Sequence, residues 1–183
     1  MKGSLIKYVL RLSLTLLAIT ALVAAALAGV NAVADPLIRA HKAEKMQKAM
    51  EEVLPGASGL AEVSFTDATG TVNKVYACQQ GFVVEVAPAG FGGAITMMVG
   101  IQPDGKVNGI SVISHTETAG LGSVAGAKNS AGEAFRGQFV GAFGALAVDK
   151  DGGNIDSITS ATITSRAVVA GVNAALEAVK GLG

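Results

Sequence analysis

The chain has 183 residues, a formal net charge of zero and only 15% charged residues, while half of its residues are hydrophobic. Its mean hydropathy of +0.50 is too high for an ordinary soluble domain, so part of the chain belongs in lipid. With no Trp, two Tyr and six Phe, it lacks the basic stripe and the aromatic platform of nucleic-acid-binding proteins. Its single Cys, Cys78, excludes an intrachain disulfide, a thiolate metal cluster and a Cys-x-x-Cys redox pair.

Residues 12–34 form a run of 23 residues without a charged side chain. As a helix with a rise of ~1.5 Å per residue, this run exceeds the ~30 Å hydrocarbon core of a bilayer, so we expect one transmembrane helix. Basic side chains in residues 1–11 precede it, and the positive-inside rule places those residues in the cytoplasm and the rest of the chain outside it. We therefore expect a single-pass protein of the inner (cytoplasmic) membrane.

A cleaved signal peptide is the alternative, because residues 32–34, Ala-Val-Ala, have the small-x-small form of a cleavage site. The apolar region of a signal peptide is typically only ~7–15 residues long, which favours an uncleaved anchor. Residues 35–55 then carry apolar side chains such as Met46, Met50 and Val53 among lysines and glutamates. This pattern predicts an amphipathic stalk helix that ends at Pro55.

Residues 56–183 predict one α+β domain with a mainly antiparallel sheet and flanking helices, large enough to bury a core of its own. Short apolar segments with Gly-rich breaks predict strands at residues 60–66, 72–78, 82–87, 94–101 and 107–114. The sequence Gln-Pro-Asp-Gly at residues 102–105 predicts a tight hairpin turn between the last two strands. Helices are predicted at residues 130–139 and, most clearly, at residues 165–179, where apolar side chains recur along one face.

The segment 156–166 reads DSITSATITSR and contains six hydroxyl side chains in eleven residues. It precedes the final helix, so we expect Thr162, Thr164 and Ser165 at the N-terminus of that helix. Free backbone N–H groups and the helix dipole favour a negative group there, and a phosphate is well suited to the position. The simpler interpretation is that Thr164 or Ser165 only caps the helix and that the other hydroxyl residues form a polar turn.

A second segment of interest, SHTETAGLGS at residues 114–123, follows the last predicted strand. Residues 120–125 match the pattern G-x-G-x-x-G/A, but no strong helix pattern begins there and a parallel βαβ frame is missing, which argues against a dinucleotide site. His115, Glu117 and a hydroxyl residue supply the residue types of a nucleophilic triad. However, no hydroxyl residue lies in the sequence context of a nucleophile elbow, which argues against this interpretation. His115 is also a poor candidate for a metal ligand, since the only other histidine, His41, lies in the predicted stalk.

Residues 156–162 resemble the flavinylation motif Asp-x-x-(Ser/Thr)-(Gly/Ser)-Ala-(Thr/Ser) of proteins that carry FMN covalently. Residues 90–122 resemble the Gly-(Tyr/Phe)-Gly-Gly and His-x-Glu-Thr-Pro-Gly-Leu-Gly blocks of the G subunit of the Rnf complex. The C subunit of the sodium-pumping NADH:quinone reductase is a more distant match. Together with the N-terminal anchor, the resemblance covers essentially the whole chain. Ala94 and Ala119 stand where the family commonly has Pro, which loosens these loops, and Ser160 takes the Gly place of the motif.

The resemblance implies an electron-transfer subunit with covalent FMN, held as phosphothreonyl-FMN at Thr162. The subunit would serve a membrane complex that couples electron transfer between ferredoxin and NAD⁺ to translocation of Na⁺ or H⁺. It would be a redox subunit of this translocase and not a catalyst on its own. The expected partners are the other membrane and peripheral subunits of an Rnf-type complex, together with a flavin transferase that makes the bond from FAD outside the cytoplasm.

The resemblance also implies which residues surround the cofactor, and no metal site or catalytic residue is expected. Besides Thr162, the expected FMN-binding residues are Ser160, Ala161, Thr164 and Ser165 around the phosphate, and His115, Glu117, Thr118, Gly120, Leu121 and Gly122 around the flavin ring. Asp156 is expected to help the transferase recognise the acceptor.

Two other functions fit the sequence. A membrane-anchored extracytoplasmic flavin reductase would use the same covalent FMN without partner subunits. A cofactor-free anchored binding module would use the hydroxyl run only to cap a helix.

Overall fold

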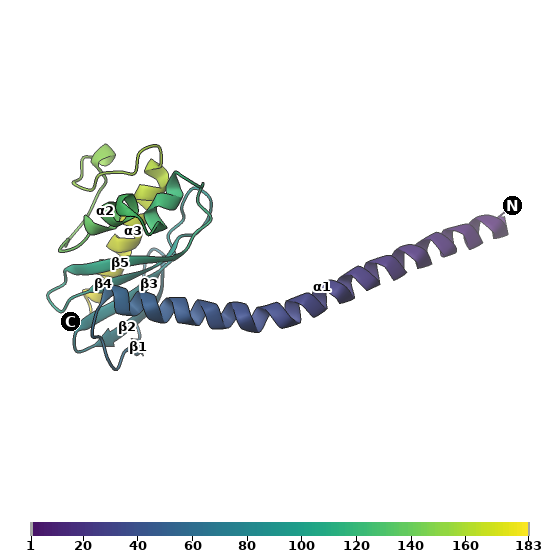
Figure 1. Cartoon of the computed structure of the whole chain (residues 1–183), viewed down its shortest axis with the longest axis horizontal. Coiled ribbons are helices and arrows are strands. Elements are labelled where there is room, and N and C mark those ends of the chain that lie inside the picture. The colour runs from purple at the N-terminus through teal and green to yellow at the C-terminus, as the bar shows by residue number, and fades with distance from the viewer. Residues whose placement is uncertain (1, 183) are drawn as a thin grey trace. The chain divides into compact units, whose positions relative to one another are not determined.

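The computed structural model describes residues 2–182 of the chain (Figure 1). Two compact units follow one another along the sequence, Met1–Glu44 and Lys45–Gly183. The first unit is helical wherever the structure describes it. The second contains the sheet, the shorter helices and the last turns of α1, and it holds all the residues of the predicted flavin site.

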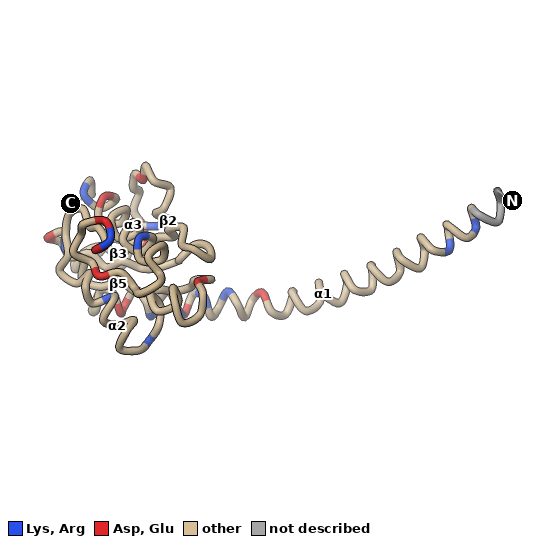
Figure 2. Tube along the Cα trace, turned by 90° about the horizontal axis from the view of Figure 1, so that it is seen from above, with Lys and Arg blue, Asp and Glu red and all other residues tan. Residues whose placement is uncertain are grey.

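Helix α1 runs without a break from Lys2 to Val53, so the predicted membrane helix and the predicted stalk form one continuous helix. Its segment Ile6–Val53 is the one helix, in the part of the chain that the structure describes, that is long and apolar enough to cross a membrane. Figure 2 shows the uncharged stretch of α1 in tan between charged residues. Helix α1 therefore supplies the candidate membrane span.

Five antiparallel strands form one sheet in the order β1-β2-β3-β4-β5. They are β1 (Ala61–Val63), β2 (Val72–Cys78), β3 (Gly81–Val86), β4 (Thr96–Ile101) and β5 (Val107–Ser114). The predicted hairpin joins β4 and β5, and in its turn the Gln102 N–H donates a hydrogen bond of 2.8 Å to the Lys106 carbonyl. The fold class predicted from the sequence, α+β with a mainly antiparallel sheet, is confirmed.

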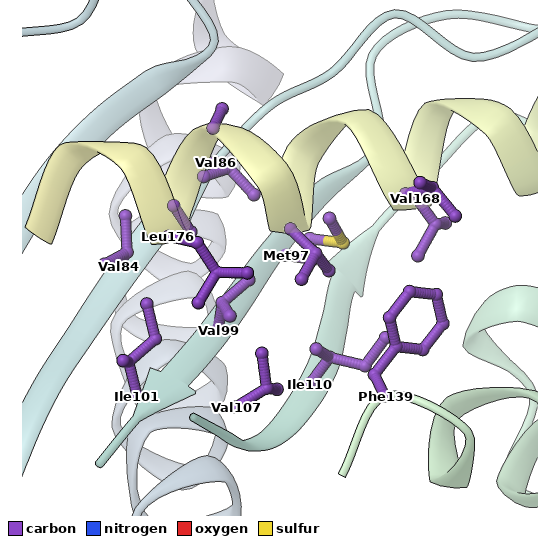
Figure 3. Packing of buried hydrophobic residues seen from close by; sticks show 14 of the residues in the cluster. Val84, Val86, Met97, Val99, Ile101, Val107, Ile110, Phe139, Val168 and Leu176 are labelled. Atoms are coloured by element: carbon purple, nitrogen blue, oxygen red, sulfur yellow. The ribbon is translucent and has the colours of Figure 1, made fainter. Parts of the chain in front are cut away.

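Helix α3 (Thr162–Val179) packs on one face of the sheet and closes the main core. Figure 3 shows Val168 and Leu176 of α3 together with inward-facing residues of the central strands, among them Val84, Met97 and Val99. Both central strands, β3 and β4, are buried along almost their whole length. Their sequences are therefore nearly continuous apolar runs. A strand that is covered on both faces does not alternate between apolar and polar residues.

The last turns of α1 cover the other face of the sheet. Ala49, Val53 and Leu54 form a second buried cluster with Val83 and Met98, whose side chains alternate along β3 and β4 with those of the main core. The sheet is thus the middle layer between the end of α1 and α3.

Three short helices connect the sheet to α3: η1 (Gly122–Gly126) and η2 (Asp149–Asp151), which are 3₁₀ helices, and α2 (Ser130–Gly137). The Asn129 side chain caps α2 by accepting a 2.9 Å hydrogen bond from the Gly132 N–H. Arg136 joins α2 to η1 because its guanidinium donates hydrogen bonds of 2.9 Å to the carbonyls of Ala125 and Ala127. These contacts fix the end of the loop at residues 115–122, which runs directly into η1.

Candidate functional site

A pocket of about 380 Å³ opens between three segments that are far apart in the sequence. They are the loop at residues 90–93, the loop at residues 115–122, and residues 160–164 at the start of α3. The lining residues are Phe91, Glu117, Thr118, Leu121, Gly122, Ser160, Ala161, Thr162, Ile163 and Thr164. Its volume lies in the range of ~300–1,000 Å³ that small-molecule sites occupy.

The N-terminus of α3 forms one wall of this pocket. The helix begins at Thr162, three residues before the predicted start, and its N-cap residue Ala161 makes no side-chain capping hydrogen bond. The first N–H groups of a helix have no intrahelical partners, and here no capping side chain occupies them. This wall is therefore suited to hold a negative group, because the helix dipole and the open N–H groups act in the same direction.

Of the hydroxyl groups in the run, those of Thr164 and Ser165 are used by the fold, while those of Ser160 and Thr162 are open to the pocket. Ser165 is fully buried; its Oγ accepts a 2.9 Å hydrogen bond from the Ile158 N–H and donates to the Ala161 carbonyl at 3.0 Å. Thr164 is 2% exposed and donates its hydroxyl to Glu117. Among the described residues, no hydrogen bond engages the hydroxyls of Ser160 or Thr162, and both residues line the pocket.

The segment just before α3 is held by hydrogen bonds from two other parts of the domain. Gln138 pairs with the backbone of Asp156, accepting from its N–H at 2.7 Å and donating to its carbonyl at 3.2 Å. The Asp149 carboxylate accepts a 3.0 Å hydrogen bond from the Ser157 N–H. Hydrogen bonds from Ser157 lower the pKa of Asp149 to about 2. The bond from its side chain has the larger effect and the bond from its backbone the smaller. Asp156 and Ser157, at the start of the hydroxyl run, are thus bonded to two other parts of the domain.

Ser160 has a φ of 60° and is the only non-glycine residue with a positive φ in residues 2–182. It occupies the Gly/Ser place of the flavinylation motif that residues 156–162 resemble. This left-handed conformation is open to glycine at little cost and is unfavourable for other residues. Ser160 therefore adopts a conformation that glycine would adopt at a lower energetic cost.

Glu117 joins the three segments around the pocket. It is 8% exposed; its Oε1 accepts a 2.8 Å hydrogen bond from the Gly92 N–H, and its Oε2 accepts from the Thr164 hydroxyl. Thr116 completes the contact by donating a 2.8 Å hydrogen bond to the Gly92 carbonyl. Both backbone groups of Gly92 are therefore bonded to the neighbouring loop.

Glycines allow these segments to approach so closely. A Cβ at Gly92 would overlap the Thr116 carbonyl, and a Cβ at Gly122 would lie 2.5 Å from the Thr164 hydroxyl oxygen and 2.6 Å from Glu117 Oε2. Distances this short are not found in proteins, so a side chain at either position would push the pocket walls apart.

Three of the predicted site residues lie outside the pocket lining: His115, Gly120 and Ser165. The His115 Nδ1 accepts a 3.3 Å hydrogen bond from the Glu117 N–H, and its ring lies against Gly126 of η1. Gly120 has a φ of 76° and donates its N–H to the Ser123 hydroxyl at 2.9 Å. His115 and Gly120 thus take part in hydrogen bonds within residues 115–123 without lining the pocket.

Two lining residues, Phe91 and Ile163, were not predicted from the sequence. Both side chains are largely exposed, at 69% and 51%, although both are apolar. Phe91 lies inside the Gly-Phe-Gly-Gly segment that carried part of the family resemblance. That resemblance could have marked Phe91 as a residue of the site. Ile163 follows Thr162 directly and had no signal beyond that position.

The family model described as FMN-binding domain matches residues 90–177, which include every wall of the pocket. The residues present fit such a ligand. Phe91, Leu121 and Ile163 offer apolar surface for a ring system, while the uncapped start of α3 offers N–H groups for a phosphate.

Curated relatives match the chain over most of its length. The G subunit of the ion-translocating oxidoreductase complex of Methanosarcina acetivorans is 31% identical over 182 residues, covering 93% of this chain and 94% of that protein. The G subunit of the Na⁺-translocating ferredoxin:NAD⁺ oxidoreductase complex of Acetobacterium woodii is 32% identical over 197 aligned positions, covering 96% of this chain and 94% of that protein. The G subunit of the proton-translocating ferredoxin:NAD⁺ oxidoreductase complex of Clostridium ljungdahlii is 45% identical over 113 residues, a match that spans 57% of this chain and 58% of that protein.

Two of these matches run through the apolar helix as well as the FMN-binding domain, with identities above 30% over nearly the full length of both chains. The chain belongs to the family of G subunits of ion-translocating oxidoreductase complexes.

Proposed function

We propose that this chain is the flavin-bearing electron-transfer subunit of a membrane complex that couples electron transfer between ferredoxin and NAD⁺ to ion translocation. FMN would be joined covalently to Thr162 through its phosphate. The observation that carries the proposal is the position of the Thr162 hydroxyl. It belongs to the first residue of an uncapped helix, it lines the pocket, and no described residue engages it in a hydrogen bond.

Burial and hydrogen bonding count against two neighbouring hydroxyls, those of Thr164 and Ser165, as attachment points. Thr164 and Ser165 are buried and bonded to Glu117 and to the backbone around Ala161, so their oxygens are not available to an enzyme approaching from outside. Ser160 is open, but its strained backbone and its place in the motif assign it to the turn before the helix.

The attachment step is the transfer of a flavin monophosphate group from FAD, carried out by a separate flavin transferase with magnesium. The Thr162 oxygen forms a new bond to the phosphorus next to the riboflavin part, and the pyrophosphate bond to AMP breaks. AMP leaves, and the hydroxyl proton is released. No electrons are exchanged in this step, and the phosphate keeps a negative charge beside the N-terminus of α3, where the open N–H groups stabilise it.

When bound, FMN supplies the capacity to accept and release electrons, which none of the described side chains in the pocket has. The chain's own residues would bind and shield it. Phe91, Leu121 and Ile163 would contact apolar parts of the ring and keep water away, while Thr118 offers a hydroxyl for a polar edge. A covalent link would also prevent loss of the cofactor into a dilute external medium.

The ion path would lie in other subunits. Among the residues that the structure describes, the chain has one candidate span, with no charged residue between positions 12 and 34, whereas ionisable residues within spans mark ion pathways through lipid. The related G subunits are named for complexes that move protons and for complexes that move Na⁺, which agrees with a subunit that carries electrons only. The N-terminus would be cytoplasmic and the flavin domain extracytoplasmic in the inner (cytoplasmic) membrane.

Peptide mass spectrometry tests the attachment. Trypsin cleaves after Lys150 and Arg166, so all the candidate hydroxyls fall in one peptide, residues 151–166. After expression with a flavin transferase, this peptide should gain the mass of FMN less one water, and fragmentation should place the addition on Thr162. An unmodified peptide would favour the cofactor-free binding module, and an addition on another residue would move the attachment.

Purification from membranes tests the assignment to a complex. The chain should co-purify with multi-span membrane subunits in a mild detergent, and the isolated chain should not reduce soluble acceptors from NADH. A flavin-loaded chain that purifies alone and sustains such turnover would support the anchored flavin reductase instead.

A further inference from the structure

We propose that Glu117 is a positioning residue that sets the distance between the walls of the flavin pocket, by binding one wall through Gly92 and the other through Thr164. This inference rests on the proposed function, because it assumes that the pocket holds a flavin tethered at Thr162. It differs from the sequence-based expectation, in which Glu117 was one of the residues around the flavin ring.

The first contact of Glu117 fixes the loop that carries Phe91. Glu117 Oε1 accepts the Gly92 N–H at 2.8 Å, and Thr116 donates to the Gly92 carbonyl at 2.8 Å, so both backbone groups of the residue after Phe91 are held. The Phe91 side chain itself is 69% exposed and has little packing to hold it. Its place at the pocket therefore depends on the anchoring of its backbone.

The second contact of Glu117 fixes the first turn of α3. The Thr164 hydroxyl, which is 2% exposed, donates to Glu117 Oε2, and Thr164 lies two residues after the proposed tether residue Thr162. One carboxylate thus connects the tether helix to the Phe91 loop. A hydrogen bond to a charged acceptor is about twice as strong as a neutral one, which suits a single residue that must hold two segments.

The surroundings of the carboxylate are closely packed. A Cβ at Gly90 would overlap Oε1, and a Cβ at Gly122 would lie 2.6 Å from Oε2. Each oxygen already accepts a hydrogen bond from the protein, and glycines enclose the group on two sides. The carboxylate is therefore built into the wall of the pocket.

A tether needs such a device. A phosphoester through Thr162 would keep the flavin on the chain, but the rotatable bonds between phosphate and ring leave the orientation of the ring free. Rigid pocket walls must fix that orientation, and electron transfer at a reproducible distance requires it. Glu117 supplies the rigidity without touching the reacting atoms.

The first test measures the clasp, the two hydrogen bonds of Glu117 to Gly92 and Thr164, without flavin. Amide hydrogen exchange at Gly92 is followed in the detergent-solubilised full chain carrying Thr162→Ala, with Glu117 intact, Glu117→Ala or Glu117→Gln. Loss of the acceptor in Glu117→Ala should speed exchange at Gly92 by roughly tenfold or more. Glu117→Gln should stay near the parent rate, because the amide oxygen accepts from Gly92 and its NH₂ donates to the Thr164 oxygen.

The second test uses the loaded full chain and separates attachment from positioning. Flavin per protein is measured by fluorescence in a denaturing gel, and the order of the ring is measured by visible circular dichroism and fluorescence anisotropy. Glu117→Ala and Thr164→Val should keep the attached flavin but reduce the visible dichroism and the anisotropy. Glu117→Gln and Thr164→Ser should keep the dichroism and anisotropy of the parent chain. The double variant Glu117→Ala/Thr164→Val should lose no more of these two signals than the single variant that loses more.

The outcomes distinguish this inference from the proposed function. A parent chain without covalent flavin overturns the proposed function, while the exchange test still decides whether the clasp exists. Parent-like exchange and dichroism in Glu117→Ala overturn the clasp. Ring signals lost equally in Glu117→Gln and Glu117→Ala also overturn it, because they would mean that the negative charge acts on the flavin directly.

Discussion

The side-chain amide of Asn108 on β5 donates a 2.8 Å hydrogen bond to the carbonyl oxygen of Val53, the last residue of α1. The last carbonyl groups of a helix have no partners within the helix, and Asn108 satisfies one of them from a strand 55 residues further along the chain. Ser111 adds a 2.7 Å hydrogen bond to the Glu52 side chain. The predicted stalk, residues 35–55, therefore ends inside the compact unit Lys45–Gly183.

A side chain at Gly100 should destabilise the domain, because α1 ends so close to the sheet. A Cβ at Gly100 would overlap the Val53 carbonyl oxygen, whereas a Cβ at Gly109 on the neighbouring strand would meet its nearest atom at 3.5 Å, an ordinary contact. Gly100→Ala should lower the free energy of unfolding by about 1–3 kcal/mol, as overpacking does. Thermal unfolding of the solubilised chain checks this against Gly109→Ala as the matched control. Equal melting temperatures for the two variants would contradict the close approach of α1.

The end of α1 should also be required for a folded, monomeric domain. A fragment that begins at Lys45 keeps Ala49, Val53 and Leu54, whereas one that begins at residue 56 exposes Val83 and Met98, which are fully buried in the intact domain. The longer fragment should elute as a monomer in gel filtration, and the shorter one should aggregate or unfold. A stable, monomeric shorter fragment would show that this cluster is dispensable.

Ser160→Gly should stabilise the chain. The residue has a φ of 60°, which costs a residue with a Cβ roughly 1–2 kcal/mol and glycine much less, although glycine also raises the entropy of the unfolded chain. We expect a net gain of about 1 kcal/mol or less in the free energy of unfolding for Ser160→Gly, and a loss for Ser160→Val. The two melting temperatures should therefore shift in opposite directions, and a shift in the same direction would argue against the left-handed conformation.

The hydrogen bonds between Asp149 and Ser157 should make stability depend on acid pH. The folded-state pKa of Asp149 is about 2, below its ordinary value of ~3.9, so the contribution of this carboxylate is complete above the ordinary pKa and is lost as the pH falls towards 2. Melting temperatures of the native chain and of Asp149→Asn should differ at pH 6 and converge near pH 2. A gap that stays constant across this range would show that the contact does not depend on the charge.

Sequence patterns predicted strands well where the pattern and the pairing agree. β2 and β5 have the bounds that were predicted, residues 72–78 and 107–114. β1 is shorter than predicted because only Ala61–Val63 pairs with β2. The continuous part of β4 begins at Thr96 instead of residue 94, although the Ile95 N–H bonds to the Pro88 carbonyl and Ala94 forms an isolated antiparallel bridge with Ala89. Where a strand stops pairing depends on its partner strand, which leaves no mark on local periodicity.

The candidate site was predictable where a motif marks it and unpredictable where distant segments meet. The hydroxyl run and the glycine loop pointed to eight of the ten lining residues. The bond between Glu117 and Thr164 joins residues 47 positions apart, and nothing in either segment specifies the other. Ser165 was expected near a phosphate, but its hydroxyl is turned to the Ile158 N–H and the Ala161 carbonyl, a distinction that only the backbone path decides.

Flavin fluorescence in a denaturing gel gives the clearest test of covalent attachment at Thr162. The native chain, Thr162→Ala and the matched control Thr164→Val are each expressed with a flavin transferase, and only covalent flavin stays with the protein band. We expect a fluorescent band for the native chain and for Thr164→Val, and none for Thr162→Ala. A band of native intensity in Thr162→Ala would contradict attachment at Thr162.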